Sequence, residues 1–202
     1  MAAECVVEME ARPRLLGSTG PGAHARGHKR ETTLVKAAQG GSSEAMEELF
    51  RRHWRGAHRA AYLVVHDGQA AEDIAQEAFI SAIRSLDRFD RRRPFAPWLH
   101  RIVVNRAIDW TRAKKARREV SGEAVPTVAP ELDLDALADA GHTFAVLKSL
   151  GPEQRAVIVL RYLLDYTPGE IADILDLPRG TVNSRLRRGL DALADVVPER
   201  QG

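Results

Sequence analysis

The chain has 202 residues and 44% hydrophobic content, which is enough apolar side chain for one or two small folded domains. A single cysteine, Cys5, excludes an intramolecular disulfide framework and a structural zinc site built from several thiolates. The formal net charge of +2 hides a strong segregation, because residues 84–118 carry twelve basic side chains against three acids. This block favours a polyanion-binding surface over a merely solvated one.

Residues 1–30 are rich in Gly, Pro, Ala, Arg and His and have no helical periodicity, so we expect a disordered N-terminal extension. Such a tail either adds weak electrostatic affinity for nucleic acid or is dispensable. It lacks the charged start and apolar core of an export signal, and no apolar run in the chain is long enough to span a membrane. We therefore expect a cytoplasmic protein with no direct membrane insertion.

Residues 31–118 have a helical pattern almost throughout and are expected to form the first module. Gly40-Gly41 separates its first two helices, and Ser42 or Ser43 is expected to cap the second. A third helix is expected over 68–89 and a fourth over 94–118. The residues expected to face inward on the last three helices are Met46, Leu49, Phe50, Ala57, Ala61, Val64, Ile74, Ala78, Phe79, Ile83, Leu86, Leu99, Val103, Ala107 and Trp110.

Polar side chains gather on separate faces of the third and fourth helices. They are Glu72, Asp73, Gln76 and Glu77 on the third, and Asn105, Asp109 and Arg112 on the fourth. Asp73 and Glu77 also have the i, i+4 spacing of a metal pair, but two carboxylates without a third ligand make a poor site. No metal or cofactor is therefore expected. Four histidines form no i, i+4 pair with one another and are expected at the surface or at a boundary: His53, His58, His66 and His100.

Residues 119–138 contain Pro126 and Pro130 and only acidic charges, so they predict a flexible acidic linker. A second compact module is expected over 139–202. In it, Thr167, Pro168 and Glu170 form a capping box with proline at the first helical position, which predicts the start of a helix.

The segment "DLPRG" ends that helix, and Thr181 is expected to cap another. The second helix of this pair has Val182, Leu186 and Leu190 on one side, and polar or basic residues on the others. The pattern is typical of a helix-turn-helix, with arginines on the first turns of the second helix where base and phosphate contacts are made. An ordinary helical hairpin with a solvated basic face is the alternative.

Three stretches together carry a resemblance to a known family: "AEDIAQEAFISAI", "FAPWLHRIVVNRAIDWTR" and "LGPEQRAVIVLRYLLDYTPGEIADILDLPRGTVNSRLRRGLDAL". Over about residues 33–195 the chain resembles the extracytoplasmic-function (ECF, group IV) sigma factors of the sigma-70 family. The resemblance implies an all-α protein with two small helical domains joined by the acidic linker. It also implies a non-enzymatic subunit that binds core RNA polymerase and directs initiation at promoters with −10 and −35 elements.

The resemblance also assigns roles to the polar residues. The acidic face of the third helix would dock on the clamp helices of the polymerase β′ subunit, and Asn105 would face the melted −10 strand. Phe95 and Trp98 fit either the core or a stacking platform. The residues implied for −10 contact are Asn105, Asp109, Arg112, Arg91, Arg92 and Arg93, and those for −35 contact are Thr181, Asn183, Ser184, Arg185, Arg187 and Arg188.

Two positions depart from the family pattern. Asn183 stands where lysine or arginine is common, which changes the base that is expected at the −35 element because Asn pairs well with adenine. Asp176 stands where glycine is common at the turn, and it is expected to adopt the left-handed backbone conformation.

The family also implies an anti-sigma factor as a further partner. A transcriptional regulator with a related helix-turn-helix, which binds DNA without replacing the sigma subunit, is the alternative function.

Overall fold

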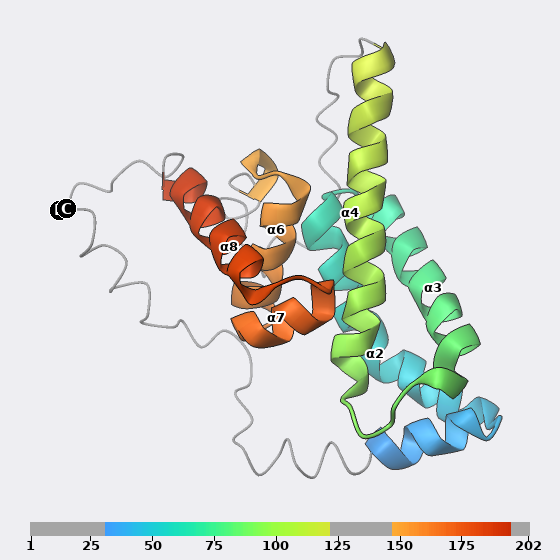
Figure 1. Cartoon of the computed structure of the whole chain (residues 1–202). Coiled ribbons are helices and arrows are strands. Elements are labelled where there is room, and N and C mark those ends of the chain that lie inside the picture. Colours follow the sequence, from blue (N-terminus) through green and yellow to red (C-terminus); the bar gives the residue numbers. More distant parts are fainter. Residues whose placement is uncertain (1–30, 122–146, 195–202) are drawn as a thin grey trace, which may run out of the picture.

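The computed structural model describes residues 31–121 and 147–194, and all regular elements in these ranges are helical. The expected all-α class is therefore confirmed for the described residues. A helix over 31–39 precedes α2 (Ser43–Val65), α3 (Gly68–Ser85), the short η2 (Leu86–Arg88) and α4 (Phe95–Ser121). The second module contains α6 (Pro152–Ile158), the π-helical segment η4 (Val159–Leu163), α7 (Pro168–Leu175) and α8 (Arg179–Ala194). Figure 1 shows α6, α7 and α8 on one side of α4, with α6 and α7 packed against it.

Local side-chain caps explain where several helices start. The hydroxyl of Ser42 accepts a hydrogen bond from the Ala45 amide at 3.2 Å, and it follows Gly41, whose φ of 89° needs glycine. Thr167 and Glu170 form the predicted reciprocal capping box at the start of α7. At the other end of α7, Asp176 has the expected left-handed conformation, with φ 55°. The Ser42 cap, the capping box and the left-handed Asp176 are thus confirmed.

The predicted cap at Thr181 is wrong, because α8 begins two residues earlier, at Arg179. The carbonyl of Pro178 accepts hydrogen bonds from the amides of Thr181 and Val182, at 2.9 and 3.2 Å. The Pro178 carbonyl, and not the Thr181 side chain, therefore accepts the hydrogen bonds at the start of α8. Thr181 lies half-buried in the first turn. The fourth helix also differs from its prediction, since α4 continues through residues 119–121 of the expected linker. The expected N-terminal extension and the rest of the linker lie outside the described residues.

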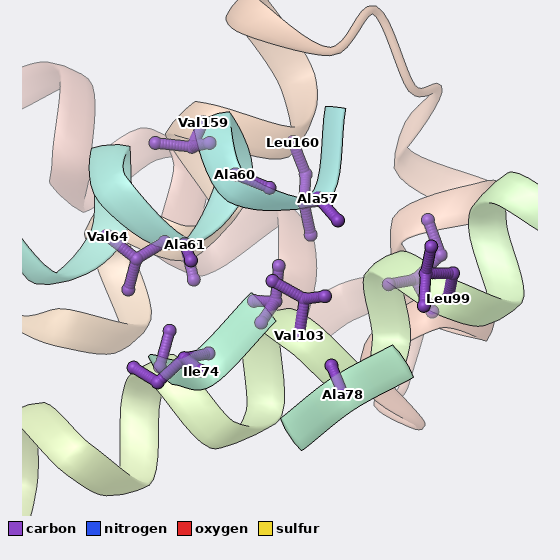
Figure 2. Close-up of a cluster of buried hydrophobic side chains, with 14 of the residues drawn as sticks. Ala57, Ala60, Ala61, Val64, Ile74, Ala78, Leu99, Val103, Val159 and Leu160 are labelled. Carbon is purple, nitrogen blue, oxygen red and sulfur yellow. The ribbon is translucent and has the colours of Figure 1, made fainter. Parts of the chain in front are cut away.

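Alanines set the close packing of the first module. Ala57, Ala60 and Ala61 on α2 and Ala78 on α3 are fully buried, and Val103 of α4 lies among them (Figure 2). Small side chains allow helix axes to approach closely, and the fully buried Leu99 and Val103 of α4 complete this interior.

Two apolar residues that were expected inside are exposed, Phe50 by 40% and Ile83 by 44%. Because alanines fill the seam between α2 and α3, larger side chains lie at its margin. Phe50 stacks there on Trp54, with ring centroids 4.9 Å apart, and contacts Phe79. Trp110 is only partly buried, and the Lys114 ammonium lies 4.3 Å from its ring centroid. The remaining predicted core residues are buried or packed against the core.

The apolar core continues from the first module into the second. Val159 and Leu160 of η4 are fully buried in the same cluster as Ala57 and Ala60 of α2 (Figure 2). Polar contacts surround this seam: Arg155 to the Val64 carbonyl, His100 to Tyr166, Arg101 to Asp176 and Arg112 to Glu153. The two helical domains therefore pack directly on one another in this structure.

His100 is buried, so its predicted surface or boundary position is wrong. Its Nδ1 lies 2.8 Å from the Tyr166 hydroxyl, which belongs to the second module. On the other side of the ring stands Gly56, where an added Cβ would lie 3.6 Å from Nε2. Burial, with a smaller contribution from the charge of His53, lowers the pKa of His100 to about 4.

Lowering the pH should therefore reduce the free energy of unfolding, because the folded chain resists protonation of His100. Below its ordinary pKa of about 6.5, the histidine takes up a proton in the unfolded chain but not in the folded one. The stability that neutral His100 confers is present above pH 6.5 and is lost as the pH falls toward 4, by up to about 1.4 kcal/mol per pH unit. Urea denaturation of the wild type and of His100→Gln, measured from pH 7.5 to 4.5, tests this. The wild type should show the steeper loss, and equal slopes would contradict the assignment.

Candidate functional site

The outer face of α8 carries the six residues that were implied for −35 contact. Asn183, Arg187 and Arg188 are exposed, whereas Thr181, Ser184 and Arg185 are half-buried. Val182 and Leu186 on the opposite face are buried, and Gly189 lets α8 approach α6, since an added Cβ would lie 3.1 Å from Cγ1 of Ile158. The inner face thus holds α8 firmly while its outer face stays accessible. An α-helix presented in this way fits the major groove of duplex DNA.

Hydrogen bonds along α8 orient two of these side chains. The Ser184 hydroxyl donates to the Thr181 carbonyl at 2.9 Å, and Nε of Arg188 donates to the Ser184 carbonyl at 3.3 Å. Arg188 keeps its terminal guanidinium nitrogens for other contacts, which suits a bidentate bond to guanine.

The polar stripe of α4, Asn105, Asp109 and Arg112, is partly covered by the second module, because Arg112 contacts Glu153 of α6. Asp109 and Arg112 are exposed and Asn105 is half-buried. The Arg112 guanidinium contacts Glu153 of α6 through Nε at 2.8 Å and Nη2 at 2.5 Å, and Asp109 lies 3.6 Å away. In the packed arrangement Arg112 is therefore engaged by a carboxylate of the same chain.

Arg91, Arg92 and Arg93 lie together in the exposed loop before α4. Arg92 makes a bidentate pair with Asp90, through Nε at 3.0 Å and Nη2 at 2.9 Å. Hydrogen bonds from Arg92 hold the pKa of Asp90 below its ordinary value. The charge of Arg92 is thus partly balanced within the loop.

An aromatic cluster lies beside this loop. Phe89 and Phe95 are buried, and the half-buried ring of Trp98 lies 4.6 Å from Phe89 and 5.5 Å from Phe95, centroid to centroid. Phe95 is therefore a core residue, and Trp98 closes the cluster toward solvent.

The acidic face of α3 is exposed at all four predicted positions, Glu72, Asp73, Gln76 and Glu77. Gln69 donates to Asp73 at 3.2 Å, Gln76 donates to Glu72 at 3.3 Å, and Arg106 of α4 donates to Glu77 at 2.6 Å. These contacts use one oxygen of each carboxylate and leave the other oxygen open to a basic partner.

The sequence did not predict that two apolar residues of α3, Ile80 and Ile83, would be exposed. Ile80 is 49% exposed and Ile83 is 44% exposed. The position of Ile80 directly after Phe79, outside the predicted inward stripe, was the available signal.

Glu153 interacts with arginines of both predicted DNA-contacting surfaces, Arg112 of α4 and Arg185 of α8. Its burial opposes ionisation, but hydrogen bonds from Arg112, together with the charges of Arg112 and Arg185, keep its pKa below the ordinary value. Arg185 belongs to α8 and Arg112 to α4, so one ionised carboxylate faces arginines from both modules.

Within residues 31–121 and 147–194, no group of three or more His, Cys, Asp or Glu side chains is arranged to hold a metal ion. No helix there has the length and apolar content needed to cross a membrane.

Comparison with known proteins gives two family matches. Residues 49–117 match sigma-70 region 2, and residues 145–193 match sigma-70 region 4. Among similar proteins, the ECF RNA polymerase sigma factor SigW of Bacillus subtilis is 33% identical over 79% of this chain and 92% of its own length. SigM of Mycobacterium tuberculosis, also an ECF RNA polymerase sigma factor, is 35% identical over 85% of this chain and 87% of its own.

A solved structure supports the fold. The sigma factor RpoE from Bartonella quintana, in complex with the anti-sigma factor NepR, superimposes with a TM-score of 0.64 at 22% identity. The match covers 77% of this chain and 98% of that one.

The two family matches fall on the two helical modules in the order that the sequence predicted. A regulator that shares only the helix-turn-helix does not account for the match to region 2. The chain belongs to the ECF group of the sigma-70 family: it binds RNA polymerase and directs it to promoters.

Proposed function

We propose that the two modules divide promoter recognition between them, with α4 and its preceding loop at the −10 element and α8 at the −35 element. The observation that carries the proposal is the presence of a separate basic helical surface on each module. The domains proposed are a tail over 1–30, a first module over 31–118, a connector over 119–138, into which α4 extends by three residues, and a second module over 139–202.

At the −35 element, α8 would read duplex DNA in the major groove. Asn183, Arg187 and Arg188 are exposed and so are suited to base edges, while Thr181 and Arg185 are suited to phosphates. Ser184 donates to a carbonyl of α8, but its hydroxyl oxygen can still accept a bond from a base.

At the −10 element, the first module would hold a melted strand. Unpaired bases expose hydrogen-bonding edges that an amide can read, and Asn105 offers both donor and acceptor groups. Asp109 and Arg112 continue the same stripe, and Arg91, Arg92 and Arg93 add positive charge for phosphates.

Core polymerase would dock on the acidic face of α3. Glu72, Asp73, Gln76 and Glu77 present three carboxylates and an amide, which complement a basic partner helix. We assign this partner to the clamp helices of the β′ subunit.

The proposal places the protein in the cytoplasm, where polymerase acts, and gives it no catalytic residue of its own. An anti-sigma factor is proposed as a further partner, because the sigma factor RpoE of similar fold is bound to one.

Run-off transcription with purified core polymerase tests the function. We expect a discrete transcript when the full chain is added to core enzyme and a promoter template, with no other sigma factor present. If a transcript requires another sigma factor, the proposed function is wrong.

Charge reversal at Asp73 tests the docking assignment. Asp73→Lys should weaken binding to core polymerase by roughly tenfold, since it places a cation against a basic surface. Its known contact is a single exposed bond from Gln69, so the fold should survive. Glu47→Lys, which reverses an exposed acid on α2, is the matched control and should bind normally. Equal affinities of the two variants for core polymerase in a fluorescence titration would show that the acidic face of α3 is not part of the docking surface.

Two substitutions on α8 should differ in their response to DNA sequence and to salt. Arg188→Ala should cost roughly 1–3 kcal/mol on the preferred −35 site and reduce discrimination among variant sites. Arg185→Ala should weaken all sites about equally and lower the slope of log affinity against log salt by about one unit.

The measurement is holoenzyme binding to a panel of −35 variants at several salt concentrations. Lys148→Ala, which removes an exposed cation outside α8, serves as the control. The same profile for both arginine variants would mean that α8 carries an undifferentiated basic face.

A further inference from the structure

The helix over 31–39, drawn in blue in Figure 1, lies beside the loop that joins α3 to α4. Nε2 of Gln39, the last residue of this helix, donates to the carbonyls of Leu86 and Phe89, each at 2.9 Å. Both partners are acceptors, so the amide nitrogen of Gln39, with its two hydrogens, must face them. Gln39 therefore holds the backbone at the point where η2 ends and the loop begins.

The other end of the same helix holds the other end of the loop. Phe95 is the first residue of α4, so its amide has no acceptor within that helix. One carboxylate oxygen of Glu31 accepts from the Phe95 amide at 3.3 Å, and the second oxygen lies 2.9 Å from Nε2 of His53. Val35 and Ala38, between the two contacts, are buried, so the helix that makes these contacts is itself fixed in the core.

The loop between the two contacts is a tight turn. The Asp90 carbonyl accepts from the Arg93 amide at 2.9 Å, and Oδ1 of Asp90 accepts from the Arg92 amide at 3.1 Å. These bonds lie within the turn, so they set its shape but not its position in the molecule. The position of the exposed Arg91, Arg92 and Arg93 therefore depends on how the two ends of the loop are held.

Two kinds of interaction hold those ends. Burial of the Phe89 and Phe95 side chains keeps the ends of the loop at the core, but apolar contacts are non-directional. The hydrogen bonds to Gln39 and Glu31 are directional, so they orient the backbone on either side of the turn.

We propose that the helix over 31–39 positions the −10 loop, residues 90–94, for promoter recognition, with Gln39 and Glu31 as positioning residues that do not contact DNA. The inference rests on the proposed −10 role of this loop. A loop held at both ends presents its arginines to a melted strand at one place. A released loop samples several places and selects bases less sharply.

Gln39→Met tests the first contact, because methionine keeps the length of the side chain and removes both donors. Run-off transcription with core polymerase, on a barcoded template library randomised at both elements, measures the base preference at each element. We expect the preference at the −10 element to fall by roughly fivefold, and the preference at the −35 element to stay as in the wild type, since α8 belongs to the other module. Ala37→Met, on the exposed side of the same helix, is the matched control and should keep both preferences.

A merely structural role for Gln39 gives a different result. A smaller folded fraction would lower transcription from every template alike and leave both preferences unchanged. An unchanged −10 preference in Gln39→Met, or equal losses at both elements, would therefore overturn the proposal. A wild type without any −10 preference in the same assay would instead refute the proposed function itself.

Two variants of Glu31 test the second contact, and they also serve if Gln39→Met does not fold. Glu31→Gln and Glu31→Ala both remove the charge beside His53, but only glutamine retains an oxygen that can accept from the Phe95 amide. Glu31→Gln should keep the wild-type −10 preference, whereas Glu31→Ala should reduce it several-fold. Equal −10 preferences in these two variants would overturn the positioning role of the helix.

Discussion

The buried guanidinium of Arg155 fixes how the two modules meet. It donates to the carbonyls of Leu147, Lys148 and Leu150 in its own module, at 2.8 to 3.1 Å, and to the Val64 carbonyl at the end of α2, at 2.5 Å. Burial lowers its pKa to about 10, so it stays charged at neutral pH. A charged group in this position needs all its acceptors, because an unpaired buried charge is strongly destabilising.

The position of Arg155 determines the positions of its neighbours. Glu153 lies two residues earlier in α6 and therefore meets Arg112, while η4 follows α6 and inserts Val159 and Leu160 beside α2. Both the polar and the apolar contacts between the modules thus depend on where α6 is anchored. The position of α8 follows from the same anchoring, because α8 packs on α6 and α7.

The sequence predicted the features that depend on local chemistry. The Thr167 capping box and the left-handed turn at Asp176 are set by a few neighbouring residues, and both were predicted.

Burial of His100 depends on Tyr166, which is distant in sequence, so no local pattern indicated it. Ile83 has the spacing of a core residue, but it is 44% exposed at the margin of a seam that alanines fill. The pairing of Arg112 with Glu153 likewise requires the tertiary structure.

The central claim is that one chain contacts two separated promoter elements through different modules. Site-specific photo-cross-linking in the assembled holoenzyme tests it most directly, with a photoreactive amino acid at Arg93 or at Asn183, both exposed. The account predicts that position 93 cross-links to the non-template strand near −10 and position 183 to duplex DNA near −35. Cross-links from both positions to the same element, or none from position 183 to DNA, would contradict it.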